Sequence, residues 1–387
     1  MKDKKENKFN LSDWLTTKLN INQKKTYRDK LIREVYDFSE KIKDDIQNKT
    51  QDTKHLLPIL NGLNGDVFEE NNDPLTIKFS FRHENKDIPL NQLSEFYDFQ
   101  QYNGKICILI HGLMGDEYMW KAMDDEDGGE NKIGDFLEKN KTAHTIYLRY
   151  NTGLHISENG RALSNLLEQL INQYGNKIKQ INLIGHSMGG LVIRSAGYYA
   201  DIQRQRWTEK LKTVFLIGVP NEGSYLAQIG FFVGHVFRKM DFSYNDYIAK
   251  FMDVRSNGIK DLSYAYLTDD DWLNENSGDL DKYTVSKVRP VPGVKYYLIG
   301  GILGKKNNIL SSYFGDGLVG SDSALTDELN TNNLENIESV IFEKENHEIR
   351  SIDKEKENIN KLKHKVKEQE QKINERFKKI EKEQEEK

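Results

Sequence analysis

Short apolar runs recur along the middle of the chain, separated by segments with helical spacing. Ile106 to Ile110 is a continuous apolar run, which is typical of a strand buried on both faces. Residues Ala162–Ile171 have the spacing of an amphipathic helix, and Gly134–Leu137 belongs to another helix. The other predicted strands are His144–Tyr150, Ile181–Ile184, Val214–Val219, Val294–Ile299 and Val340–Phe342. This alternation predicts an α/β fold, with a mainly parallel sheet and helices on both faces.

The segment before the first buried run has a different pattern. Leu75 to Phe81 alternates apolar and polar positions, which is the period of a strand. Residues 74–102 are therefore expected to form an antiparallel leading edge of the sheet. Residues 55–66 form a short apolar segment that ends in glycines. Residues 116–130 are acidic and contain glycine, so they are expected to form a surface loop.

A second apolar segment, residues 225–237, follows the strand that ends at Val219. It is too short to span a bilayer. Two interpretations remain open: residues 225–267 lie over a functional site, or the apolar segment is a buried helix of the main domain. Residues 241–290 contain aromatic residues but few strand signals, which indicates irregular structure. Residues 225–290 are therefore a candidate lid or cap.

The two ends of the chain lie outside this alternation. Residues 1–54 are polar, and an apolar stripe within them (Leu31, Val35, Phe38, Ile42) predicts an N-terminal helical extension. Residues 351–387 are mostly charged and carry β-branched residues at every seventh position (Ile352, Ile359, Val366, Ile373, Ile380). These residues would occupy the a positions of a heptad repeat, so this C-terminal helix is expected to form a homodimeric coiled coil or to pack on the N-terminal stripe. Because the matching d positions are mostly polar, a solvated charged helix is the third alternative. The main domain is thereby expected to span residues 55–350.

Composition narrows the classes of function. The chain has 387 residues, 37% of them hydrophobic, and a net charge of -5, so it has a sizeable core and no sign of a nucleic-acid partner. Its one cysteine, Cys107, excludes an internal disulfide framework and fits a reducing compartment. The N-terminus lacks the apolar core of a secretory signal, and no run of about 18 apolar residues occurs. We therefore expect a cytoplasmic protein without a membrane span, and peripheral membrane contact stays open.

A nucleophile motif follows one of the predicted strands. Residues 185–189 read Gly-His-Ser-Met-Gly, the G-x-S-x-G pattern of a nucleophile elbow. The elbow holds its serine on a tight strand-to-helix turn, where side chains two residues away on either side would collide. Gly185 and Gly189 satisfy this requirement, and the helix predicted after Ser187 directs the positive end of its dipole toward the serine.

A serine nucleophile needs a base to take its proton and an acid to orient that base. In folds with this elbow the chain order is serine, acid, histidine. Of the three histidines after Ser187, His347 follows the last predicted strand, whereas His235 precedes every candidate acid and His364 lies in the charged C-terminal segment. Asp316 lies between two glycines beyond the strand at 294–299, and Asp322 is the alternative acid.

Two backbone amides are expected to form the oxyanion hole that stabilises the tetrahedral intermediate. One belongs to Met188, the residue after the nucleophile. The other belongs to Leu113, in the loop that follows the strand at 106–110. Their amides matter for this role, and their side chains do not.

The motifs together resemble those of α/β-hydrolase lipases and esterases. The resemblance covers about residues 56–350 and rests on ILIHGLMG, YLRYNTG, LIGHSMGGLVIRSA, LIGVPNEGS and GDGLVGSDSAL. Within this group, the chain most resembles bacterial lipases and GPI inositol-deacylase-like serine hydrolases. Val219 stands where many lipases have threonine, and Asn221-Glu222 replaces the usual His-x. The last motif resembles the loop that carries the catalytic acid, which favours Asp316.

The resemblance implies hydrolysis of carboxylic esters, with lipid acyl esters as a narrower class, through an acyl-enzyme intermediate and without a cofactor or metal. The substrate would be a small-molecule or lipid ester. An acyltransferase or a thioesterase would use the same triad, because only the acceptor or the leaving group differs. A non-catalytic scaffold, in which the terminal helices carry the function, is the alternative from a different class.

Overall fold

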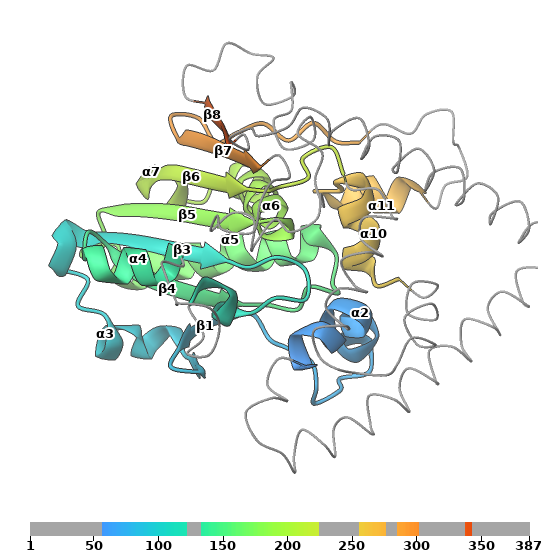
Figure 1. Cartoon of the computed structure of the whole chain (residues 1–387), viewed down its shortest axis with the longest axis horizontal. Coiled ribbons are helices and arrows are strands. Elements are labelled where there is room, and N and C mark those ends of the chain that lie inside the picture. Colours follow the sequence, from blue (N-terminus) through green and yellow to red (C-terminus); the bar gives the residue numbers. More distant parts are fainter. Residues whose placement is uncertain (1–55, 122–132, 224–254, 276–284, 302–336, 343–387) are drawn as a thin grey trace, which may run out of the picture. The chain divides into compact units, whose positions relative to one another are not determined.

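The computed structural model describes residues 56–121, 133–223, 255–275, 285–301 and 337–342, all within one compact unit that spans residues 1–342 (Figure 1). An eight-stranded sheet with the order β2-β1-β4-β3-β5-β6-β7-β8 forms its centre. The strands are β1 (Ser80–His83), β2 (Lys86–Ile88), β3 (Lys105–Ile110), β4 (His144–Arg149), β5 (Gln180–His186), β6 (Leu211–Ile217), β7 (Lys295–Gly301) and β8 (Ile337–Phe342). The chain has the α/β-hydrolase fold.

Strands β4, β3, β5, β6, β7 and β8 are neighbours in this sequence across the sheet, and each is parallel to the next. The hairpin of β1 and β2 is antiparallel and pairs with β4 at one edge of the sheet. The expected antiparallel leading edge is therefore present, but it is limited to residues 80–88. The rest of the predicted edge contains three short helices, η2 (Leu90–Gln92), α3 (Leu93–Phe96) and η3 (Gln101–Gly104).

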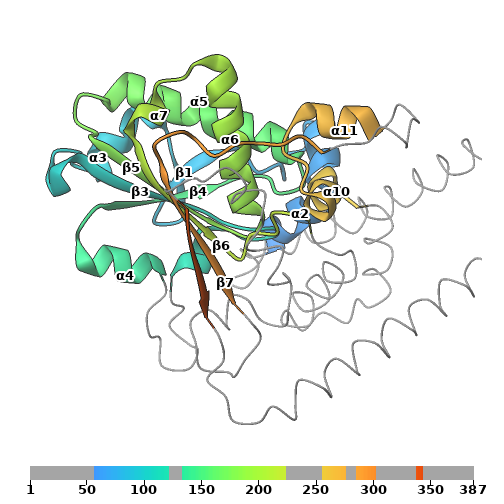
Figure 2. The same cartoon turned by 90° about the horizontal axis from the view of Figure 1, so that it is seen from above.

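Helices cover both faces of the sheet, as predicted (Figure 2). Helices α5 (Ile156–Tyr174) and α6 (Met188–Gln203) pack on one face, and their fully buried residues, such as Leu163, Leu167 and Leu191, join the larger apolar cluster. Helix α4 (Ile133–Asn140) covers the other face, where a smaller cluster contains Cys107 and Trp120. A four-residue helix, α7 (Trp207–Lys210), leads into β6. No helix among the described residues is both long and apolar enough to cross a membrane.

Three helices occur where the sequence predicts none, and they lie beyond the carboxyl ends of the parallel strands (Figure 1). Helix α2 (Leu56–Glu70) replaces the expected short apolar segment and is broken at Asn64. Helices α10 (Asn257–Tyr264) and α11 (Asp269–Glu275) show that the prediction of irregular structure over 241–290 is wrong for these residues. The Ser256 hydroxyl donates to the carbonyl oxygen of Gly62 at 2.7 Å, which joins α10 to α2.

Several predictions fall outside the described residues. These are the N-terminal extension (1–54), the C-terminal heptad helix (351–387), the apolar segment at 225–237, and the candidate acid and base, Asp316, Asp322 and His347. They stay predictions.

Candidate active site

Ser187 lies at the junction of β5 and α6, on the strand-to-helix turn that a nucleophile elbow requires. Its backbone has φ 51° and ψ -125°, in the positive-φ region that favours glycine. Two hydrogen bonds hold this conformation. The Ser187 N–H donates to the carbonyl oxygen of Ile217 at 2.9 Å, and its carbonyl accepts from the Gly190 N–H at 3.0 Å. The side chain is half-buried.

Glycines allow the elbow to pack closely against the neighbouring backbone. A Cβ atom added at Gly185 would lie 2.7 Å from the Gly190 backbone, and one added at Gly189 would collide with the carbonyl oxygens of Ile110 and His111. Added at Gly190, it would collide with the Val219 side chain. The glycines of the elbow therefore allow two close contacts, one within the turn and one between the turn and the end of β3.

The loop after β3, residues 111–115, lies directly beside Ser187, and we call it the oxyanion loop. A Cβ atom added at Gly112 would lie 3.0 Å from the Ser187 Cβ atom. Within the loop, the Gly115 N–H donates to the Gly112 carbonyl at 3.1 Å. Met114, with φ 57°, donates its N–H to Thr152 Oγ1 at 3.1 Å.

His111 fixes the orientation of the peptide bond between Gly112 and Leu113. Its ring is fully buried and stacks on Tyr150 at 4.4 Å between centroids. Nε2 accepts from the Tyr150 N–H at 3.3 Å, so Nδ1 carries the proton and donates to the Gly112 carbonyl at 2.9 Å. Burial lowers the pKa of His111 to about 4, so the ring is neutral at physiological pH.

This arrangement leaves the two expected oxyanion amides available. In a trans peptide the N–H points opposite to the carbonyl. The Gly112 carbonyl is held by His111 and Gly115, so the Leu113 N–H is directed away from them. Met188 is the first residue of α6, where a helix leaves its N–H groups without intrahelical partners. Neither amide donates a hydrogen bond to another group of the described residues.

The residues after the oxyanion loop contradict the prediction of an exposed acidic loop. The 3-10 turn η4 (Glu117–Trp120) begins there, and Asp116 caps it by accepting the Tyr118 N–H at 3.0 Å. Asp116 and Glu117 are only 5% and 4% exposed. The burial of Glu117 is compensated by charge, because its carboxylate accepts hydrogen bonds from Arg82 and Arg149.

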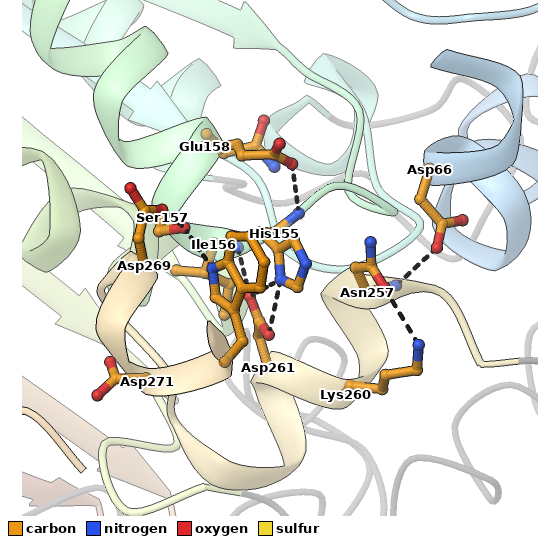
Figure 3. Close-up of polar contacts among 12 residues, drawn as sticks. Asp66, His155, Ile156, Ser157, Glu158, Asn257, Lys260, Asp261, Asp269 and Asp271 are labelled. Carbon is orange, nitrogen blue, oxygen red and sulfur yellow. Dashed lines mark hydrogen bonds and ion pairs between the residues drawn. The ribbon is translucent and has the colours of Figure 1, made fainter. Parts of the chain in front are cut away.

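A second polar cluster lies at the N-terminus of α5 (Figure 3). His155 Nδ1 contacts the two carboxylate oxygens of Asp261 at 3.0 and 3.1 Å, and the ring stacks on Trp272 at 4.0 Å between centroids. The same carboxylate accepts the Ile156 N–H at 2.8 Å. Burial raises the pKa of Asp261 to about 6. This pair cannot be predicted from the sequence, because the two residues are 106 positions apart.

The structure thus brings together five of the predicted site residues: Ser187, Leu113, Met188, Gly185 and Gly189. It also adds His111 and Thr152 as residues that shape the oxyanion loop. A histidine directly after a buried strand and before a glycine was the available signal for His111. Thr152 has no comparable signal, since its role depends on a contact with Met114 across 38 positions.

Residues 101–287 match the family model of the PGAP1-like alpha/beta domain. No curated protein matches the chain. Among solved structures, the chain is similar to the mature lipase BlEst2 of Bacillus licheniformis, with 17% identity and a TM-score of 0.38 over 62% of this chain and 83% of that chain. It is also similar to the Pyrococcus furiosus esterase Pf2001, with 16% identity and a TM-score of 0.37 over 62% and 72% of the two chains. Phospholipase PlaB from Legionella pneumophila has 17% identity and a TM-score of 0.32 over 51% of this chain and 39% of that chain.

Proposed function

The chain has the α/β-hydrolase fold and its residues 101–287 match the family model of the PGAP1-like alpha/beta domain, and on this premise we propose that it is a serine hydrolase of carboxylic esters. One observation carries the proposal: a serine on a strained strand-to-helix turn lies against a loop in which the Leu113 amide makes no hydrogen bond with the described residues. A buried serine with a purely structural role has no need of the positive φ at Ser187. The proposed substrates are acyl esters, and esters of lipids are the narrower class within them.

In the proposed reaction, the Ser187 Oγ atom attacks the ester carbonyl, and His347 takes its proton. Asp316 orients the His347 ring and stabilises its charged form. The developing oxyanion accepts hydrogen bonds from the amides of Leu113 and Met188. As the tetrahedral intermediate collapses, the bond to the alcohol oxygen breaks, His347 gives its proton to that oxygen, and the alcohol leaves with the acyl group still bound to Ser187. A water molecule, activated by His347, then hydrolyses this acyl-enzyme.

Helix α6 favours the step that develops negative charge. It is 16 residues long and begins at Met188, so the positive end of its dipole lies at the nucleophile. Neutral His111 adds no charge of its own to the site but holds the Gly112 carbonyl away from the position of the oxyanion. Stabilisation of the oxyanion by preorganised amides contributes about 10²–10³ in rate per donor in enzymes of this type.

A serine-directed fluorophosphonate probe tests the proposal. Labelling of the wild type at Ser187, together with loss of labelling and of ester hydrolysis in Ser187→Ala, is the expected result, with a rate reduced by roughly 10⁶. His347→Ala should be similarly damaging and Asp316→Asn somewhat less so. A severe effect of Asp322→Asn beside a mild effect of Asp316→Asn would reassign the acid. Near-normal turnover by purified, folded Ser187→Ala would refute the mechanism.

A panel of esters with graded acyl chains defines the substrate within this class. A preference for long chains would support a lipid substrate and peripheral contact with a membrane. A preference for short chains would restrict the activity to small esters.

A further inference from the structure

A buried carboxylate stands between two arginines next to the oxyanion loop. Glu117 Oε1 accepts from Arg82 Nε at 2.9 Å and from Arg149 Nη2 at 2.8 Å, and Oε2 accepts from Arg149 Nε at 2.8 Å. The side chains of Glu117 and Arg82 are 5% and 4% exposed, and that of Arg149 is 15% exposed. Both carboxylate oxygens are therefore occupied, in a geometry that is strong because donor and acceptor are charged.

The two arginines come from neighbouring strands. Arg82 lies in β1 and Arg149 at the end of β4, and these strands are hydrogen-bonded, with Ser80 paired to Arg149 and Arg82 paired to Tyr147. The sheet therefore fixes the two guanidinium groups relative to each other. A carboxylate that bridges them has a defined position with respect to the sheet.

Because Glu117 follows the oxyanion loop closely in the chain, its fixed position also restricts the end of the loop. It stands two residues after Gly115, whose N–H closes the loop on the Gly112 carbonyl. At its other end the loop continues from β3, and in the middle Met114 is held by Thr152. Without the Glu117 carboxylate, this end of the loop would lose its charged attachment to Arg82 and Arg149, and so to β1 and β4.

We propose that Glu117 is a positioning residue, which holds the oxyanion loop so that the Leu113 amide meets the developing oxyanion. This inference rests on the proposed hydrolase function. It assigns no direct contact with substrate to Glu117. Its effect should appear in the transition state and not in the affinity for the ground-state ester, because the amide matters most where charge develops.

The test compares Glu117→Gln with Glu168→Gln. Glu168 is a carboxylate that accepts the Arg206 and Trp207 amides at 2.8 and 3.1 Å. These amides lie just before β6, at the amino ends of the parallel strands, whereas Ser187 lies at the carboxyl ends. Glu168→Gln therefore controls for the general effect of removing a structural carboxylate.

Three measurements are needed: hydrogen exchange of peptides that cover residues 109–121, kcat and KM for a chromogenic ester, and the affinity for a trifluoromethyl ketone, which mimics the tetrahedral intermediate. In Glu117→Gln we expect faster exchange, kcat and ketone affinity reduced by roughly 10²-fold, as for a misplaced catalytic group, and a KM close to that of the wild type. Glu168→Gln should leave all three near the wild-type values.

Glu117→Asp covers the case in which Glu117→Gln does not fold. It keeps the charge but is one methylene shorter, so it cannot bond both guanidinium groups in the same way, and it should reduce kcat and ketone affinity without changing KM. Wild-type ketone affinity in either folded variant would overturn the assignment, even if exchange is faster, because Glu117 would then be only structural. Failure of the wild type to react with fluorophosphonate would instead refute the hydrolase function, and the inference with it, before any variant is measured.

Discussion

Gly112 lies so close to Ser187 that a Cβ atom added to the glycine would come within 3.0 Å of the serine Cβ atom. The same atom would lie 3.1 Å from Nδ1 and 3.2 Å from the carbonyl oxygen of His186. The backbone of the oxyanion loop thus packs closely against Ser187 and His186 of the nucleophile elbow.

Gly112→Ala should therefore impair the reaction more than the fold. Part of the added methyl group meets backbone, which yields less easily than a flexible side chain. We expect the loop or the serine to shift and the rate of acylation by a chromogenic ester to fall by roughly 10²-fold. Pre-steady-state measurement of the acylation burst gives this rate directly.

Gly197→Ala is the matched control in the same helix as the elbow. A Cβ atom there would meet only the end of the Val291 side chain, at 2.9 Å. Alanine is favoured over glycine inside a helix, but Val291 must shift slightly, so this variant should keep full activity and change the free energy of unfolding by less than about 1 kcal/mol. Equal acylation rates in Gly112→Ala and the wild type would show that the contact does not constrain the site.

The elbow can be predicted from the sequence because its signals are contiguous. The apolar strand, the glycines, the serine and the start of the helix all lie within residues 180–190. The parallel sheet is predictable for a similar reason, since each buried strand is a short run of apolar residues. The triad order then suggests Asp316 and His347, whose positions lie outside the described residues.

The burial of Glu117 cannot be predicted in this way. Its partners Arg82 and Arg149 are 35 and 32 positions away, and an acidic segment with glycines is usually solvated. Helices α10 and α11, of 8 and 7 residues, are too short for a clear helical period. One local signal was available, because Ser256 caps α10 by accepting the Ile259 N–H.

Backbone strain at Ser187 gives a prediction about stability. With φ 51° and ψ -125°, any residue with a Cβ atom is disfavoured there by about 1–3 kcal/mol, and glycine is not. Ser187→Gly should therefore be more stable than Ser187→Ala by about 1 kcal/mol, after the larger conformational entropy of glycine in the unfolded chain is subtracted. Both variants are expected to be inactive. The difference between their free energies of unfolding in chemical denaturation therefore measures the cost of the strained backbone at this position. Equal midpoints would show that the elbow stores no strain.

Neutral His111 makes stability depend on pH. Its pKa is about 4 in the folded protein, against an ordinary value of 6.5, because burial disfavours the charged ring. Below pH 6.5 the unfolded chain takes up a proton that the folded protein does not. This contribution is therefore complete above pH 6.5 and is lost as pH falls toward 4, by about 3 kcal/mol in total.

The His111→Gln variant keeps hydrogen-bonding groups but cannot titrate. Urea denaturation between pH 4 and 7.5 should show that the wild type loses stability relative to this variant as pH falls. Parallel curves would mean that His111 is protonated in the folded protein as easily as in the unfolded chain. Because the ring stays neutral above about pH 4, a rise of ester hydrolysis with pH near neutrality would report on another group, which we expect to be His347.

Asp261 should have the opposite effect on stability. Burial raises the pKa of this carboxyl from 3.8 to about 6, although its hydrogen bond with His155 favours the ionised form. Between these two values the folded protein holds a proton that the unfolded chain has released. The contribution is therefore complete below pH 3.8 and is lost as pH rises through 6, again by about 3 kcal/mol.

The substitution Asp261→Asn removes this titration and keeps an oxygen that can accept from His155 and from the Ile156 amide. Its free energy of unfolding, relative to that of the wild type, should rise by about 3 kcal/mol between pH 4 and 7. For His111→Gln, the free energy of unfolding relative to the wild type should instead fall between pH 4 and 7. In the wild type, the contribution of His111 grows over this pH range while that of Asp261 is lost. The double variant should consequently have a flatter profile than either single variant. If Asp261→Asn follows the wild type at a constant difference from pH 4 to 7, the carboxyl does not hold its proton in the folded protein, and the His155–Asp261 contact is an ordinary ion pair.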